Sequence, residues 1–242
     1  MTRPVRRLVH AYLRRLGPER ERRARRRVRR LRRPAYVGTV RRTVPVSRDF
    51  GYDRGSPVDR YYIERFLAER RAAITGRVLE VKDAGYTTRF GSGVTQADVL
   101  DVDRSNERAT IVGDLQRLDG VADDTFDCFV LTQTLQFVYD LEAAVGHVHR
   151  ILKPGGTLLA TVPVVSRVIR IPGRLDDYWR FTQASCERLF GGRFGDVDVV
   201  SYGNVLASTA FLRGLAADEL RRRDLDVVDP DYATLLGVAA RK

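Results

Sequence analysis

The chain of 242 residues contains two cysteines and three lysines, and both shortages limit what the protein can be. Cys128 and Cys186 lie in apolar stretches, which is typical of small core residues and not of a disulfide framework. We therefore expect a reducing compartment. With Lys82, Lys153 and Lys242 as its lysines, the chain draws almost all of its positive charge from arginine. Because arginine is used throughout, the number of arginines does not by itself indicate a binding site.

Long apolar runs are missing as well. No stretch approaches the roughly 18 apolar residues of a membrane-spanning helix, and the first residues lack the apolar centre of a secretory signal. The sequence therefore predicts a cytoplasmic protein. The arginine-rich start leaves an organelle transit peptide as an alternative.

Positive charge is concentrated in the first part of the chain. Residues 1–42 contain 17 Arg and two Glu, a charge of +15, so the other 26 basic and 29 acidic residues sum to −3. This division predicts a basic arm over 1–42, a joint and leading helix over 43–76, and a nearly neutral folded domain over 77–242.

The arm has a regular apolar pattern. Leu8, Tyr12 and Leu16 recur every four residues among the arginines, as do Ala24 and Val28 before Leu31. With Gly17 and Pro18 between the two groups, the pattern predicts two short basic amphipathic segments. A solvated arm, a contact with an anionic membrane surface and a grip on nucleic acid all fit this pattern. We favour the membrane surface over nucleic acid, because apolar residues separate the arginines. The location would then be cytoplasmic and peripheral at the membrane, and the oligomeric state stays open.

The joint leads into a helix. Ser56 is a suitable cap, Pro57 suits the first turn, and the helix should run to about Gly76. The polar stretch 59–61 in its first turn fits either a salt-bridged surface or the lid of a pocket. The predicted buried face consists of Tyr62, Ile63, Phe66 and Leu67.

Beyond the joint, strand and helix patterns alternate. A helix is predicted over 140–152, between the fourth and fifth strands. Such alternation predicts an α/β fold with an open, mostly parallel, seven-stranded sheet and helices on both faces. The predicted strands cover 77–81, 94–98, 109–113, 126–131, 157–162, 197–201 and 232–239.

Ligands of such sheets bind beyond the carboxyl ends of the strands. Asp98 suits a ribose diol there, with Asp101 and Asp103 as rivals, and Asp114 suits an exocyclic amine. Each acid alone would more simply cap a loop, but together they favour a nucleoside site. Four polar residues fall at the expected ends: Glu80, Asp98, Asp114 and Thr132.

The stretch "TFDCFVLTQTLQFVYDLEAAVGHVHRILKPGGTLLATVP", residues 125–163, resembles the second half of class I S-adenosylmethionine-dependent methyltransferases, particularly the type 11 group. The R-x-L-K-P-G-G turn at 150–156 and the preceding Phe126-Asp127 carry this resemblance. It implies a Rossmann-like methyltransferase fold, methyl-transfer activity and S-adenosylmethionine as cofactor. Neither a metal nor a particular catalytic residue is implied.

The resemblance also implies roles for single residues. Glu80 and Asp83 would lie beside the methionine part of the cofactor, where Gly85 leaves the turn some freedom. Asp98 would hold the ribose, Asp114 and Leu115 would flank the adenine, and Thr132 and Gln133 would face the sulfonium. The chain departs from the family at Lys82, Ala84 and Tyr86, where glycines are usual, and at Phe137, where histidine is usual. Lys82 is a candidate partner for the carboxylate of the cofactor.

The methyl acceptor is expected to contact "RLDDYWRFT", residues 174–182. Asp176 and Asp177 are candidate bases, and Arg180 is a candidate donor to an anionic or hydroxylated acceptor. Tyr178 and Trp179 would form aromatic walls, unless Trp179 and Phe181 pack on the core. We favour a small molecule or glycan as acceptor, through a sugar or lipid-linked glycan oxygen. A non-catalytic scaffold and an RNA methyltransferase are the alternatives.

Overall fold

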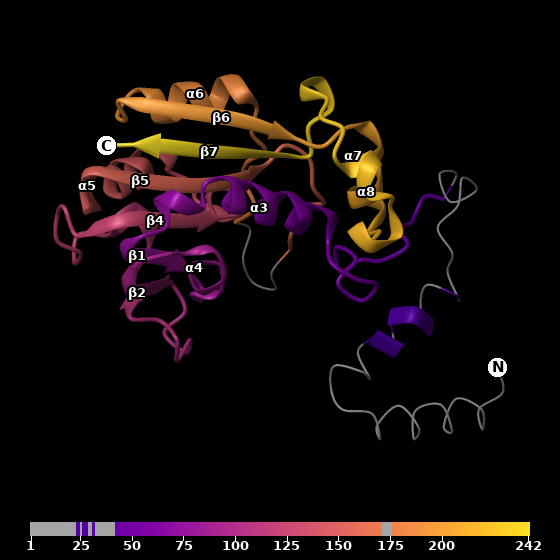
Figure 1. The fold of residues 1–242 in the computed structure, drawn as a ribbon, viewed down its shortest axis with the longest axis horizontal. Helices are drawn as coiled ribbons and strands as arrows, with labels where there is room; N and C mark the ends of the chain where they lie inside the picture. The colour runs from indigo at the N-terminus through magenta and orange to yellow at the C-terminus, as the bar shows by residue number, and fades with distance from the viewer. Residues whose placement is uncertain (1–22, 25, 29–30, 32–41, 171–175) are drawn as a thin grey trace.

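A single seven-stranded sheet organises the computed structural model, which describes residues 23, 24, 26–28, 31, 42–170 and 176–242 (Figure 1). The spatial order is β3-β2-β1-β4-β5-β7-β6. Neighbouring strands pair in parallel from β3 to β5, and β7 is antiparallel to both β5 and β6. The predicted fold class is therefore confirmed. The strands are β1 (Gly76–Val81), β2 (Val94–Asp101), β3 (Ile111–Val112), β4 (Phe126–Thr132), β5 (Leu152–Pro163), β6 (Asp196–Tyr202) and β7 (Leu235–Arg241).

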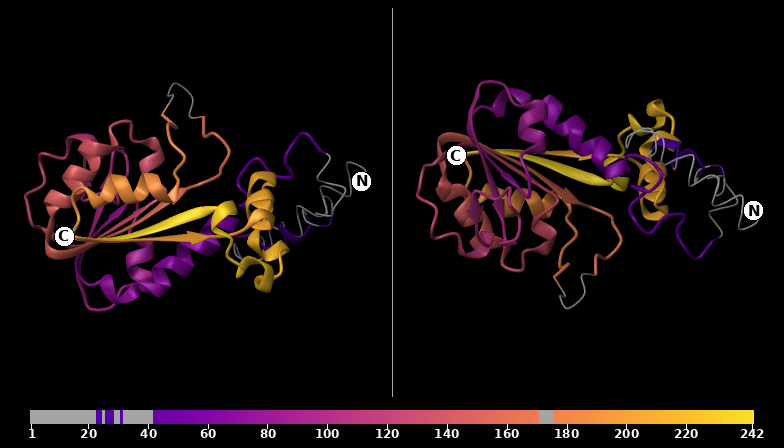
Figure 2. Two further views of the ribbon diagram at one scale, coloured as in Figure 1. Left: turned by 90° about the horizontal axis from the view of Figure 1, so that it is seen from above. Right: turned by 90° about the horizontal axis from the view of Figure 1, so that it is seen from below.

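Helices cover both faces of the sheet, as the edge views in Figure 2 show. On one face lie α3 (Val58–Glu69) and the short α4 (Gly85–Phe90); on the other lie α5 (Leu141–Ile151) and α6 (Gln183–Gly191). Each face has its own buried cluster, with Phe66 in the first and Phe129 in the second. Because β4 is covered on both faces, it is almost continuously apolar. Its Cys128 and the Cys186 of α6 are buried and free, as the sequence predicts.

The connection from β6 to β7, residues 203–234, forms a cap at the carboxyl end of the parallel strands (Figure 1). The joint packs against this cap: Arg54, which is almost fully buried, donates two hydrogen bonds to Glu219 at 2.8 and 2.5 Å. The N–H of Val46 donates to the carbonyl of Arg213. These contacts hold the joint beside the end of the sheet where ligands of this fold bind. The cap contains α7 (Val205–Arg213), η5 (Ala217–Glu219), α8 (Arg222–Leu225) and η6 (Pro230–Tyr232).

The structure corrects both ends of the leading helix. Ser56 does not cap it; the backbone N–H of Ser56 donates to Asp218, and its carbonyl accepts from the N–H of Ala217. The helix begins at Val58 and ends at Glu69, short of the predicted Gly76. The backbone of Ser56 thus pairs with residues 217 and 218, and Pro57 takes the N-cap position of the helix. The predicted apolar face is confirmed, since Tyr62, Ile63, Phe66 and Leu67 are all buried.

The remaining short elements are η2 (Arg71–Ala73), η3 (Leu115–Arg117) and η4 (Leu135–Phe137). Among the residues described, no helix is both long and apolar enough to cross a membrane. The predicted lipid-facing residues Leu8, Tyr12 and Leu16 lie outside the described part of the chain.

Candidate functional site

The turn after β1 is built around Glu80. This residue is almost fully buried, and its carboxylate accepts hydrogen bonds from the N–H groups of Tyr86 and Thr87 at 3.0 and 2.7 Å. Burial raises the pKa of Glu80, and the bonds with Thr87 and Tyr86 oppose that rise. Glu80 therefore fixes the start of α4 at the carboxyl end of β1. Its direct contact with a cofactor stays a prediction.

The turn itself keeps a glycine-like shape without glycine. Lys82 has a φ of 71°, in the left-handed region that glycine adopts at little cost. Asp83 accepts from the N–H of Gly85, and the carbonyl of Lys82 accepts from the side chain of Asn106. The surrounding bonds thus hold a lysine where the backbone conformation favours glycine. The roles predicted for Asp83 and Gly85 toward a cofactor stay predictions.

The placement predicted for Asp98 at the end of the second strand is wrong. β2 continues to Asp101, and Asp98 lies within the strand, opposite Leu79 of β1. Its buried carboxylate accepts from Arg77 Nε at 2.7 Å and from the hydroxyl of Thr110 at 3.1 Å. The ion pair with Arg77 explains why an acid is tolerated inside the sheet. Asp98 is thus committed to the fold and does not reach the ligand edge.

A hollow of about 600 Å³ lies at the ends of β2 and β3. Asp103 lines it from the loop after β2, and Asp114 lines it from the loop after β3. Two exposed aliphatic side chains, Val102 and Val112, also line it, together with Arg104 and Gly113. Two carboxylates beside two valine side chains suit a nucleoside, which offers hydroxyl and amine donors on a flat apolar ring.

The structure therefore distinguishes between the three candidate acids Asp98, Asp101 and Asp103. Asp101 ends β2, but its carboxylate accepts from Asn106 Nδ2 at 2.7 Å and from the N–H of Asp103 at 3.0 Å. Asp103 is exposed, and hydrogen bonds from the hydroxyl and N–H of Ser105 lower its pKa, so it is ionised at neutral pH. Asp103 is consequently the best-placed carboxylate for a diol, and Asp101 supports the loop that presents it.

The two residues predicted beside the adenine have different positions. Asp114 lines the hollow and also caps η3, because its carboxylate accepts from the N–H of Gln116 at 2.9 Å. Leu115 is almost fully buried in the core and is not among the residues that line the hollow. Val102 and Val112, in place of Leu115, are the apolar side chains that line the hollow. Their signal was available, since each is an apolar residue at or beyond a strand end.

At the end of β4, Thr132 pairs with Thr161 of β5, and Gln133 follows with a φ of 48°. The side-chain Nε2 of Gln133 is buried and has no hydrogen-bond partner in the described part of the chain. Non-glycine residues in this backbone region are found preferentially where the surrounding structure holds them for function. The contact of Thr132 and Gln133 with the reacting groups stays a prediction.

The segment after β5 leaves the sheet on the side of α5 and α6, shown in orange in Figure 2. Asp177 is held inside it, accepting from Arg180 Nη1 at 2.6 Å and from the N–H of Ile169 at 2.6 Å. Burial alone would raise the pKa of Asp177, but the Arg180 and Ile169 hydrogen bonds lower it overall. This pairing makes Asp177 a poor base and leaves Arg180 partly committed to the segment.

Three aromatic side chains gather beside this segment. Tyr178 and Trp179 are both within aromatic contact of Tyr139, with ring centroids 5.3 and 6.4 Å apart. The N–H of Tyr178 donates to the carbonyl of Gln136, and Trp179 Nε1 donates to the carbonyl of Val138. All three rings are substantially exposed, so Trp179 does not pack on the core, whereas Phe181 does. Tyr139 was not among the residues selected from the sequence.

The first turn of α3 forms a further polar group at this edge. Arg60 lies over the rings of Tyr52 and Tyr86, and its Nη2 donates to the Tyr52 hydroxyl at 3.1 Å. Asp59 is partly exposed by area, yet burial of its carboxyl raises the pKa to about 6. Arg60 therefore contacts the turn after β1, whereas Tyr61 contacts Asp226, and the pocket-lid interpretation stays a prediction.

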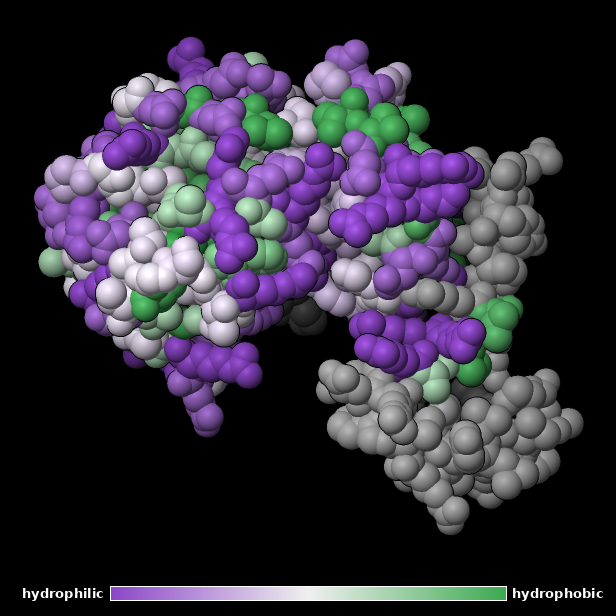
Figure 3. All heavy atoms as spheres, viewed as in Figure 1, coloured by the Kyte–Doolittle hydropathy of each residue, from purple (hydrophilic) through white to green (hydrophobic). Residues whose placement is uncertain are grey.

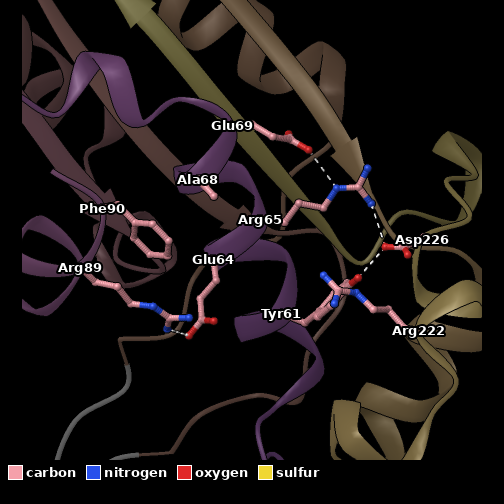
Figure 4. A pocket seen from close by; sticks show the side chains of 9 residues that line it. All are labelled: Tyr61, Glu64, Arg65, Ala68, Glu69, Arg89, Phe90, Arg222 and Asp226. Atoms are coloured by element: carbon pink, nitrogen blue, oxygen red, sulfur yellow. Dashed lines mark hydrogen bonds and ion pairs between the residues drawn. The ribbon is translucent and has the colours of Figure 1, made fainter. Parts of the chain in front are cut away.

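A second hollow, of about 460 Å³, lies between α3, α4 and the region around α8 (Figure 4). Arg65 bridges Glu69 and Asp226, and the hydroxyl of Tyr61 also donates to Asp226. These contacts hold the cap against α3, so we assign this hollow a structural role. Among the described residues, no group of three or more His, Cys, Asp or Glu side chains is arranged to hold a metal ion.

Comparisons with known proteins agree with this architecture. Residues 84–160 match the family model described as "Methyltransferase domain". A "SAM dependent methyltransferase" from Archaeoglobus fulgidus superposes with a TM-score of 0.52 and 12% identity, over 76% of this chain and 94% of that one. A methyltransferase of the same description from Mesorhizobium loti gives 0.51 and 17%, over 76% and 98%.

A third structure, the "putative sarcosine dimethylglycine methyltransferase" from Galdieria sulphuraria, gives a TM-score of 0.52 at 15% identity, over 75% of this chain and 86% of that one. No curated protein matches the chain in sequence. The strand order and these superpositions show the Rossmann-like fold of class I methyltransferases, and residues 84–160 carry the match to the methyltransferase family model. The cofactor that this class implies is S-adenosylmethionine.

The residues present fit that cofactor. Its ribose needs hydrogen-bond acceptors, which Asp103 supplies, and its adenine needs an apolar wall and an acceptor, which Val102, Val112 and Asp114 supply. The departures at Lys82, Ala84 and Tyr86 change the turn's side chains without removing the hollow.

Proposed function

We propose that the protein is an S-adenosylmethionine-dependent methyltransferase whose adenosine site is the hollow at the ends of β2 and β3. The observation that carries this proposal is the presence of Asp103 and Asp114 on one hollow with Val102 and Val112. The bound cofactor supplies a methyl group on a positively charged sulfur. Asp103 accepts from the ribose hydroxyls, and Asp114 accepts from the adenine amine. Asp103 takes the role that the sequence interpretation gave to Asp98.

A sugar or lipid-linked glycan oxygen is the proposed methyl acceptor. Tyr139, Tyr178 and Trp179 support this assignment, because exposed aromatic faces pack well against the apolar face of a sugar ring. Arg180 holds this segment in place through its ion pair with Asp177. Alignment of acceptor and cofactor supplies much of the acceleration in a displacement of this kind. The paired Asp177 is not needed as a base in this scheme.

The N-terminal arm is proposed to place the enzyme at an anionic membrane surface. The cap supports this, since Val205, Leu206, Val227 and Val228 are exposed on it, and Figure 3 shows hydrophobic side chains grouped over the same part of the molecule. Arg213, at the end of α7, donates to the carbonyl of Arg42, where the arm meets the cap. A peripheral location at the membrane would suit a lipid-linked acceptor.

Vesicle co-sedimentation tests this location. Changing Leu8, Tyr12 and Leu16 to Ser should reduce binding to vesicles containing phosphatidylserine and leave binding to RNA unchanged, because apolar burial helps at a lipid interface. Preference of the unchanged protein for structured RNA over these vesicles would instead favour an RNA methyltransferase.

A non-catalytic scaffold is the second candidate function. The observation that favours it is Lys82 in a left-handed conformation in the turn after β1, where glycine would fit without strain. A scaffold of this fold would bind the cofactor weakly or not at all.

Calorimetry with S-adenosylhomocysteine separates the two functions. We expect binding by the unchanged protein and a loss of about 1–3 kcal/mol in Asp103→Asn, because charge-assisted hydrogen bonds to the diol are weakened. Asp101→Asn should have a smaller effect, and Asp119→Asn, at an exposed acid whose side chain is 88% accessible, should have none. Absence of binding at millimolar ligand would support the scaffold.

A further inference from the structure

The side chain of Arg60 is fixed beside the turn that follows β1. Its guanidinium carbon lies 5.3 Å from the ring centre of Tyr86 and 5.9 Å from that of Tyr52. The hydrogen bond to the Tyr52 hydroxyl adds a third constraint. Tyr86 is the second residue of α4, and its N–H donates to Glu80 at the end of β1. Arg60 therefore brings a positive charge from a different segment of the chain to the end of β1.

Among the described residues, the charge of Arg60 has no direct acidic partner. In the part of the chain that the structure describes, no carboxylate oxygen lies within 4 Å of the Arg60 guanidinium, whereas Arg65 on the same helix pairs with Glu69 and Asp226. The neighbouring Asp59 accepts from the backbone N–H of Arg60 at 2.8 Å. Arg60 thus differs from Arg65 in lacking an ion pair, although both extend from α3.

Two donors in this group are also without acceptors. Arg60 Nε and the Tyr86 hydroxyl are both buried, and neither has a hydrogen-bond partner in the described residues. Burial raises the pKa of Tyr86, so the phenol keeps its proton and remains a donor. A buried donor left unpaired costs about 1–3 kcal/mol, and native structures normally satisfy such groups with protein, water or a ligand.

A cation and two unpaired donors together suit a carboxylate, which has no proton to donate and accepts several hydrogen bonds. We propose that Arg60 and the Tyr86 hydroxyl bind the carboxylate on the methionine part of S-adenosylmethionine. This inference rests on the proposed function and assigns the end of the cofactor opposite the adenosine hollow. The anchor supplies from α3 and α4 what a glycine-rich turn supplies through close backbone approach.

Two ligands that differ in the amino-acid part test this assignment. S-adenosylhomocysteine carries the carboxylate, and 5′-methylthioadenosine keeps the adenosine and sulfur but lacks the amino-acid group. In the full chain, Arg60→Gln should weaken S-adenosylhomocysteine about 10- to 100-fold and leave 5′-methylthioadenosine unchanged, because a charge-assisted contact is lost from one ligand. Tyr86→Phe, which keeps the ring contacts, should weaken the first ligand about 3- to 10-fold.

Arg65→Gln is the matched control, since it removes a paired arginine from the same helix and should change neither affinity. Equal weakening of both ligands by Arg60→Gln, or no weakening of either, would overturn the assignment. Binding of 5′-methylthioadenosine but not of S-adenosylhomocysteine by the unchanged protein would overturn it too. If the unchanged protein bound neither ligand, the proposed function itself would fail, and this inference with it. Circular dichroism checks folding, and Tyr86→Phe decides the question if Arg60→Gln does not fold.

Discussion

The adenosine half of the candidate site and the half at the end of β1 take their polar groups from different kinds of element. Asp103 and Asp114 come from loops that directly follow neighbouring strands, and both line one hollow. At the end of β1, the polar groups instead come from α3 and α4, and the contact of Arg60 with Tyr86 joins them. The first half follows from strand order, whereas the second depends on how a preceding segment packs.

The comparison explains how the turn can lack glycines. In the adenosine half, the side chains of Asp103 and Asp114 line the hollow. In the other half, Glu80 secures the backbone of the turn by accepting from Tyr86 and Thr87. Since side-chain groups surround the turn, glycine is not required for the turn to form, although Lys82 adopts a left-handed conformation there.

The largest effect that would sharpen this comparison is expected at Glu80. Glu80→Ala leaves the N–H groups of Tyr86 and Thr87 buried without an acceptor, so we expect the free energy of unfolding to fall by about 2–4 kcal/mol. Both S-adenosylhomocysteine and 5′-methylthioadenosine should bind more weakly, because the turn shapes the whole edge. Chemical denaturation and calorimetry measure the two effects.

Glu64→Ala is the control for this change. It removes an acid of α3 that pairs with the exposed Arg89, so its effect on stability should stay within about 1 kcal/mol. Normal stability in Glu80→Ala would show that the turn does not depend on that carboxylate.

The second effect is a pH dependence at Asp59. Burial raises the pKa of Asp59 from 3.8 to about 6, so the folded state holds this proton more tightly than the unfolded state does. Stability contributed by this group is therefore lost as pH rises from about 4 to about 6, and Asp59→Asn should remove that loss. At pH 7.5 the variant should gain about 1–3 kcal/mol in free energy of unfolding.

Denaturant unfolding of both proteins from pH 4 to pH 8 measures this difference. The same change removes a negative charge beside Arg60, so it should tighten S-adenosylhomocysteine more than 5′-methylthioadenosine. A difference between variant and unchanged protein that does not vary with pH would contradict the assignment to Asp59.

The smallest effect is expected at Lys82. Lys82→Gly relieves a left-handed backbone at φ 71°, and we expect the free energy of unfolding to rise by about 0.5–1 kcal/mol. The matched control is Lys82→Ala, which removes the same side chain but keeps the backbone strain. Lys153→Gly would not serve, because Lys153 forms an ion pair with Asp127. Equal stabilities of the Gly and Ala variants would show that the turn is not strained at this position.

Periodicity and family resemblance were sufficient to predict the sheet, the helix over 140–152 and the buried face of α3. They failed where a boundary depends on contacts far along the chain. Asp98 was placed at a strand end because strand length cannot be read from its residues, and the pairing with Arg77 that keeps it inside the sheet joins two different strands. Ser56 was assigned as a cap because nothing nearby shows that Asp218 and Ala217 engage it.

By itself, the sequence determined the class of fold, because apolar spacing and turn residues act over a few neighbouring positions and can be recognised in a short stretch of sequence. It also determined that acids follow β2 and β3. The tertiary structure alone decided which acids line the hollow. It also decided that Arg60 lies against Tyr86. Both depend on side chains brought together from separate elements, and the energies of such contacts arise from packing that no single segment contains.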